Sequence, residues 1–155
     1  MIIFEYKVSP AQLSPNAPES IFRITVTSDK GNNVITWFQD KKYLHTVPAS
    51  EVNKIKNIIK ASPELFKIPE HLEPNAVLDG EKYSFIFSDG KNTNSFSGFN
   101  ILDYGRKPRK NATLALRVAR EIKEAVLDLN HIRTMIPARL QHWPKGRKSS
   151  GVVKI

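Results

Sequence analysis

The chain has 155 residues, 40% hydrophobic and 25% charged, which predicts a single domain with enough residues for its own core. With 7 Gly, 10 Pro and no Cys, the composition excludes collagen-like chains, disulfide scaffolds and cysteine-based zinc sites. The net charge is +9, and no apolar run approaches the roughly 20 residues that span a bilayer. Since the first residues also lack the pattern of a secretory signal, we expect a cytoplasmic protein.

The first part of the chain predicts strands. In residues 2–8 apolar and polar side chains alternate, which predicts a strand with Phe4 and Tyr6 facing a core. The proline-containing segment 9–20 predicts a loop. Residues 21–27 and 34–38 alternate in the same way around the turn Asp29-Lys30-Gly31-Asn32, which predicts a hairpin. Residues 43–47 are a candidate extension of it.

The middle of the chain predicts a helix and a second hairpin. Apolar residues recur at helical spacing from Val52 to Ile59, and the segment from Pro63 to Phe66 predicts a short extra turn capped by Ser62. Residues 83–88 and 94–99 flank Asp89-Gly90, a dipeptide typical of two-residue hairpin turns. We expect four aromatic side chains to fill the core on the sheet: Trp37, Tyr83, Phe85 and Phe87.

A second helix is predicted over residues 112–129, with Asn111 as its N-cap and i,i+4 ion pairs from Arg117 to Glu121 and from Arg120 to Glu124. The predicted fold is therefore α+β, an antiparallel sheet of two β-hairpins and an N-terminal strand with two amphipathic helices on one face. We expect residues 1–130 to form this domain and residues 131–155, which contain no acidic residue, to form a basic C-terminal arm.

Charge divides the chain unevenly. Residues 1–103 carry 11 Lys and Arg against 12 Asp and Glu, a net charge of −1. Residues 104–155 carry 13 against 3, a net charge of +10. This asymmetry is typical of a near-neutral body with a basic segment that meets an anionic partner, although a basic surface can also serve solubility alone.

The sequence contains none of the common catalytic signatures. No phosphate-binding loop, dinucleotide fingerprint, nucleophile elbow or zinc-protease helix occurs. The four histidines have no pair at helical ligand spacing, and we interpret His45 as a polar residue on the solvent side of a strand. We therefore predict no catalytic residue, no metal site and no cofactor.

The candidate site is basic. Lys and Arg contact phosphates by charge, and an indole such as that of Trp143 can stack on a base. The candidate anion-binding residues are Arg106, Lys107, Arg109, Lys110, Arg117, Arg120, Arg139, Trp143, Lys145, Arg147 and Lys148.

Two functions compete for these features. The first is a non-catalytic binding protein whose basic C-terminal third engages nucleic acid. The second is a small protein-interaction or inhibitor module, of the phage or immunity type, that masks an acidic protein partner. An enzyme would require His45 and a hairpin carboxylate to converge in one pocket.

Overall fold

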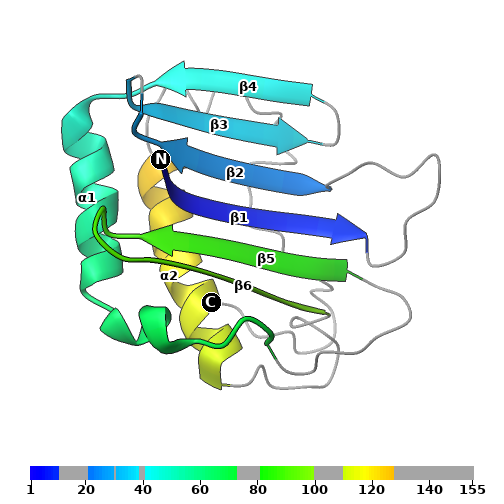
Figure 1. The fold of residues 1–155 in the computed structure, drawn as a ribbon. Helices are drawn as coiled ribbons and strands as arrows, with labels where there is room; N and C mark the ends of the chain where they lie inside the picture. The colour runs from blue at the N-terminus through cyan, green and yellow to red at the C-terminus, as the bar shows by residue number, and fades with distance from the viewer. Residues whose placement is uncertain (11–20, 30, 39–40, 73–80, 100–109, 128–155) are drawn as a thin grey trace.

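The computed structural model describes residues 1–10, 21–29, 31–38, 41–72, 81–99 and 110–127. The strands and helices, in chain order, are β1 (Ile2–Pro10), β2 (Phe22–Thr27), β3 (Asn33–Phe38), β4 (Lys41–Thr46), α1 (Ala49–Lys60), the 3-10 helix η1 (Pro63–Lys67), β5 (Glu81–Ser88), β6 (Thr93–Phe99) and α2 (Lys110–Leu127). The strands form one sheet in the order β4-β3-β2-β1-β5-β6, and all neighbours are antiparallel (Figure 1).

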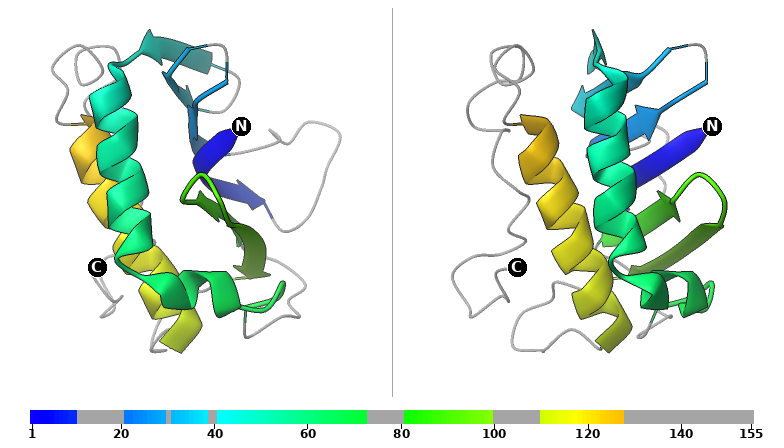
Figure 2. Two further views of the ribbon diagram at one scale, coloured as in Figure 1. Left: turned by 60° about the vertical axis from the view of Figure 1, so that its left-hand side comes forward. Right: turned by 90° about the vertical axis from the view of Figure 1, so that its left-hand side faces the viewer.

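The molecule has two layers. Both α1 and α2 lie on the same side of the sheet, and no helix among the described residues covers the other side, which we call the open face (Figure 2). The α+β class with an antiparallel sheet and two helices is therefore confirmed.

The core between the layers is rich in aromatic rings. The ring centroid of Phe85 lies 5.4 Å from that of Tyr6, 6.0 Å from that of Phe87 and 5.4 Å from that of Phe96. These four side chains are at most 3% exposed. Strand β1 and strand β5 supply most of them because they are central neighbours, with Tyr6 paired to Phe85. The predicted burial of Tyr83, Phe85 and Phe87 is confirmed.

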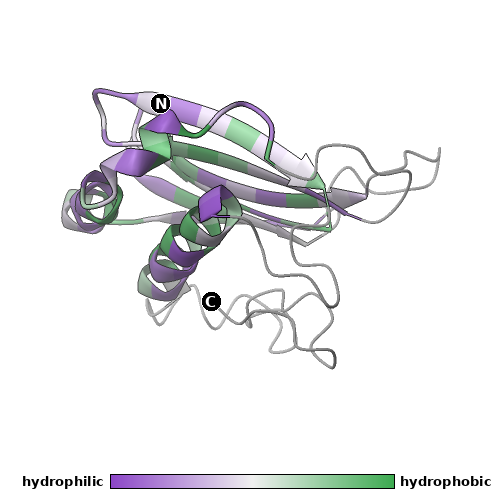
Figure 3. Ribbon diagram, turned by 90° about the horizontal axis from the view of Figure 1, so that it is seen from below, coloured by the Kyte–Doolittle hydropathy of each residue, from purple (hydrophilic) through white to green (hydrophobic). Residues whose placement is uncertain are grey.

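Helix α1 follows the predicted apolar spacing, with Val52, Ile55 and Ile59 buried. The buried side of helix α2 consists mainly of alanines, such as Ala115, and of branched residues, such as Leu116 and Ile122. Figure 3 shows hydrophobic residues on the side of α2 toward the sheet and hydrophilic residues on the opposite side. The predicted N-cap is wrong, because α2 begins at Lys110 and Asn111 lies within its first turn.

The turn between β5 and β6 is closed by one side chain. Asp89 Oδ1 accepts hydrogen bonds from the backbone amides of Lys91, at 2.8 Å, and Asn92, at 2.7 Å. Gly90 adopts φ +94°, a conformation that residues with a Cβ rarely adopt. These amides, that of Asn92 first, lower the pKa of the Asp89 carboxyl below its usual value because they stabilise the ionised form.

Two predictions about the first half of the sheet are wrong. Trp37 pairs across the sheet with Arg23 and Lys42 and is half-buried on the open face, instead of filling the core. His45 pairs with Val34, which is 1% exposed, so it lies on the helix side, while Leu44 is 54% exposed on the other. His45 lies on the edge strand β4, and Trp37 lies on β3, where apolar residues occur on both sides of the strand. Sequence alternation defines two sides of each strand but does not identify which one faces the core.

The predicted basic arm, residues 131–155, and the predicted domain boundary at residue 130 lie outside the described residues. Within the ranges that are described, no helix is both long and apolar enough to cross a membrane.

Candidate functional site

Most of the residues predicted to bind an anion lie outside the described part of the chain. Three are described, and all three are on α2: Lys110, Arg117 and Arg120. The eight that lie outside it are Arg106, Lys107, Arg109, Arg139, Trp143, Lys145, Arg147 and Lys148.

Helix α2 places two of the three cations on one line. Lys110 and Arg117 are seven residues apart, so they lie within about 20° of the same direction and about 10.5 Å apart along the helix axis. Both are exposed. They occupy the outward side because the inward positions carry buried residues such as Ala115, Leu116 and Ala119.

Arg120 already forms an ion pair within the helix. Its Nε lies 3.0 Å from Glu124 Oε1, which confirms the predicted i,i+4 pair. Both side chains are about half exposed, at 43% and 56%, and a pair this exposed contributes little stability. Arg120 therefore remains available to another anion. Lys123, in contrast, is 6% exposed and does not belong to the outward surface.

The charges on α2 oppose its dipole. The first turn contains Lys110 and no acidic residue, and the last turn contains no basic residue. A helix has partial positive charge at its N-terminus, so acids are usually favoured there and bases at the other end. The start of α2 is therefore a region of positive potential that no acid of that turn neutralises.

The open face carries a second set of polar and charged groups, which local sequence patterns do not single out. Cross-strand pairing aligns two rows of side chains over the sheet. From β4 to β6 the cationic row consists of Lys42, Trp37, Arg23, Lys7, Ser84 and Ser97. The adjacent mixed row consists of Leu44, Ile35, Thr25, Glu5, Ile86 and Ser95.

One buried carboxylate fixes the centre of this face. Glu5 is 7% exposed, and its Oε1 accepts hydrogen bonds from Arg23 Nε at 2.9 Å and from the Thr25 hydroxyl at 2.9 Å. Arg23 Nη2 lies 2.7 Å from the same oxygen. The carboxylate is thus satisfied by a cation and a hydroxyl on the neighbouring strand, and the guanidinium is held in one orientation.

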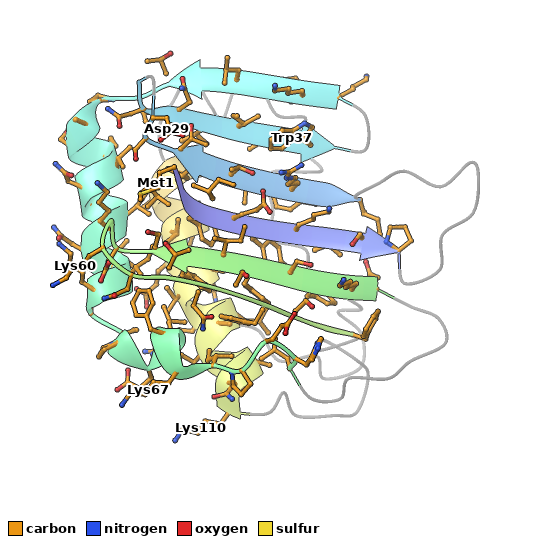
Figure 4. All side chains as sticks on the ribbon, viewed as in Figure 1. Met1, Asp29, Trp37, Lys60, Lys67 and Lys110 are labelled. Carbon is orange, nitrogen blue, oxygen red and sulfur yellow. The ribbon has the colours of Figure 1, made fainter. Side chains whose placement is uncertain are left out.

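Trp37 lies beside that guanidinium. The Arg23 guanidinium carbon is 4.4 Å from the Trp37 ring centroid, and Lys42 Nζ is 5.7 Å from it (Figure 4 labels Trp37 on β3). A second pair of this kind lies at the other side of the sheet, where Lys82 Nζ is 5.9 Å from the Phe99 ring centroid. Both distances to lysine are within the range in which a cation is attracted to an aromatic face.

A shallow hollow of about 250 Å³ lies over β1, β5 and β6. Its polar lining includes Lys7, Glu70, Ser84 and Ser97. Glu70 reaches the hollow because its segment pairs with β6: Ser97 N donates to Glu70 O at 3.0 Å. This arrangement offers donors, acceptors and one ammonium group, but no nucleophile activated by a neighbouring base.

The residues of the open face leave a partial signal in the sequence. The alternation of β1 identifies Glu5 and Lys7 as one side of a strand. The residues that lie beside Glu5 and Lys7 are determined by the strand order, because it pairs Lys7 with Ser84 from a distant part of the chain. No local pattern contains that information.

The described residues contain no group of three or more His, Asp or Glu side chains that could hold a metal ion. Comparison of the chain with protein-family models gave no match, and a search of curated proteins gave none either.

Proposed function

We propose that this protein binds nucleic acid, without catalysis, through its basic C-terminal third. The observation that carries the proposal is the distribution of charge: 13 Lys and Arg against 3 Asp and Glu in residues 104–155, and near-neutrality before them. Phosphate backbones bind such arrays because each neutralised phosphate releases condensed counterions.

The described part of α2 supports the proposal in two ways. Lys110 and Arg117 are exposed on one line of the helix, so both can contact phosphates of one bound strand. The first turn also carries a cation at a position where acids are favoured, and this lowers the stability of the isolated helix. Local conflicts of this kind are expected at functional sites, and here a bound phosphate would relieve the conflict.

The remaining basic residues extend this surface in the proposal. Arg106, Lys107, Arg109 and Lys110 hold phosphates, and Arg117 and Arg120 continue the contact along α2. Residues 131–155 act as an arm, in which Trp143, Arg147 and Lys148 clamp the strand, and Arg139 and Lys145 add charge.

The test is a salt series of binding by the full chain to labelled single-stranded DNA, duplex DNA and RNA. The key variant replaces Arg106, Lys107, Arg109 and Lys110 with Ala. We expect weaker binding and a salt slope smaller by about 0.7 to 0.9 for each phosphate that the variant no longer neutralises. The matched control removes four exposed lysines from the rest of the chain, namely Lys54, Lys60, Lys67 and Lys91.

Unchanged affinity and salt slope in the key variant would overturn the proposal. The alternative, a module that masks an acidic protein, predicts instead no binding to any nucleic acid at physiological salt and co-purification with one defined polypeptide. An equal decrease in the control variant would show that net charge, and not this segment, determines binding.

A further inference from the structure

We propose that the open face of the sheet is a separate binding surface for single-stranded nucleic acid, in which a base stacks on Trp37 and the lysines of the cationic row contact phosphates. The proposal concerns β1–β6 and does not depend on α2 or on the C-terminal residues. It follows from three observations on the described residues.

The first observation is an aromatic ring that is held in place yet remains accessible. Trp37 is half-buried on a face that no described helix covers (Figure 2). Arg23 is bonded to Glu5 and lies 4.4 Å from the ring centroid, so it restricts the orientation of the indole. Lys42 is exposed and more distant, at 5.7 Å, so a base can displace its ammonium group and stack on the ring.

The second observation is the charge balance of this face. Its cations are Lys7, Arg23, Lys42 and Lys82. The carboxylates beside them are Glu5, which is bonded to Arg23, and Glu70, which lines the hollow. Among the described side chains of this face, the cations therefore outnumber the carboxylates, and the excess positive charge lies beside the aromatic rings. Positive grooves with aromatic side chains suit single strands, because every base has a face to stack and every nucleotide has a phosphate.

The third observation is a second aromatic and cationic pair across the sheet. Phe99 lies on β6, with Lys82 Nζ 5.9 Å from its ring. Strands β3 and β6 are separated by β2, β1 and β5, so Trp37 and Phe99 are about 19 Å apart at the usual strand spacing. Ser84 lies between them on β5, and Ser97 lies beside Phe99 on β6; the hydroxyls of both can donate to phosphate or base oxygens.

A single strand fits this surface better than a duplex. The stacking surfaces of duplex bases are occupied by neighbouring bases, whereas unpaired bases can turn outward onto aromatic side chains. We therefore expect the open face to prefer single-stranded oligonucleotides, and sequence preference to be weak because stacking does not distinguish bases strongly.

The experiment uses the fluorescence of Trp37. The chain has two tryptophans, so in the full chain with Trp143→Phe the emission comes from Trp37 alone. Titration with a thymidine oligonucleotide should quench this emission as binding saturates. In the same background Trp37→Ala leaves no tryptophan, so binding by this variant is measured from the anisotropy of a labelled oligonucleotide. Binding should be weaker by about 5-fold to 150-fold, as expected for the loss of one stacking side chain. Trp37→Phe, which keeps an aromatic face, should retain most of the affinity.

Salt dependence separates stacking from charge. Trp37→Ala should leave the salt slope unchanged, while Lys7→Ala with Lys42→Ala should lower it by about 1.4, the value for two neutralised phosphates on a single strand. Lys54→Ala with Lys60→Ala is the matched control, because it removes the same charge from the exposed side of α1.

The outcomes distinguish the two binding surfaces. Weaker binding by the Trp37→Ala variant, with normal binding after substitution of Arg106, Lys107, Arg109 and Lys110, would support the open face and overturn the proposed role of the C-terminal third. The absence of quenching, or equally weak binding by Trp37→Phe and Trp37→Ala, would overturn the open-face proposal and leave the other untouched.

Discussion

The guanidinium carbon of Arg23 lies 4.4 Å from the ring centroid of Trp37, and the same guanidinium is bonded to the buried carboxylate of Glu5. One side chain thus links a buried acid to a half-exposed aromatic ring. The two contacts are made on three adjacent strands, β1, β2 and β3, and they hold the centre of the open face in one arrangement.

The Glu5–Arg23 pair should contribute measurably to stability. In the Arg23→Ala variant Glu5 stays largely buried and keeps the Thr25 hydroxyl as its described hydrogen-bond donor. We expect a decrease of about 1.5–3 kcal/mol in the free energy of unfolding, measured by urea titration, because a buried charged group is deprived of a partner. The double variant Glu5→Ala with Arg23→Ala should be destabilised by less than the sum of the single variants. Additive effects would show that the pair is not coupled.

Gly90 should not tolerate a Cβ. Its φ of +94° is unfavourable for residues other than glycine, although a Cβ there would meet only ordinary contacts, the nearest at 3.6 Å from Lys56 Cε. Gly90→Ala should therefore destabilise the protein by about 1–2 kcal/mol through backbone strain. The control is a second alanine in the same turn, Lys91→Ala, which adds no Cβ and leaves the backbone amide of residue 91 able to donate to Asp89. Equal, small effects of both variants would contradict the prediction.

Asp89 should make stability depend on pH in the acid range. Its pKa is lowered in the folded state, chiefly by the amides of Asn92 and Lys91, and the unfolded value is about 3.9. The stabilisation is therefore fully present above the unfolded pKa and is lost as pH falls through the folded one. Asp89→Asn keeps an oxygen acceptor but does not titrate, so the difference in unfolding free energy between wild type and variant should shrink from about pH 5 to about pH 2. A constant difference over that range would contradict the assignment.

Leu44 and Leu65 provide a matched test of the register of β4. Leu44 is 54% exposed, whereas Leu65 in η1 is 0% exposed. Leu44→Ala should change the free energy of unfolding by less than about 0.5 kcal/mol, and Leu65→Ala should cost about 2–5 kcal/mol. Thermal or urea unfolding of the two variants measures both. A large destabilisation at Leu44 would place that residue inward and His45 outward, as the alternation in the sequence suggests.

The local features of this protein follow from its residues alone. Helical spacing located α1 and α2, alternation located the strands, and aromatic residues at every second position of β5 identified its core side. These predictions succeeded because the residues concerned are covered on one side only, which leaves a clear period in the chain. The division of charge at residue 104 is likewise a property of the sequence.

How the strands meet depends instead on packing between distant parts of the chain. The placement of β5 beside β1 pairs Lys7 with Ser84, and the pairing of β2, β3 and β4 puts Trp37 between Arg23 and Lys42 on the open face. Alternation defines two sides of every strand, but the side that becomes the core depends on which strands and helices pack there. For Trp37 and His45, long-range strand pairing determines which side of the sheet each side chain occupies. The open face as a whole could therefore not be identified from the sequence.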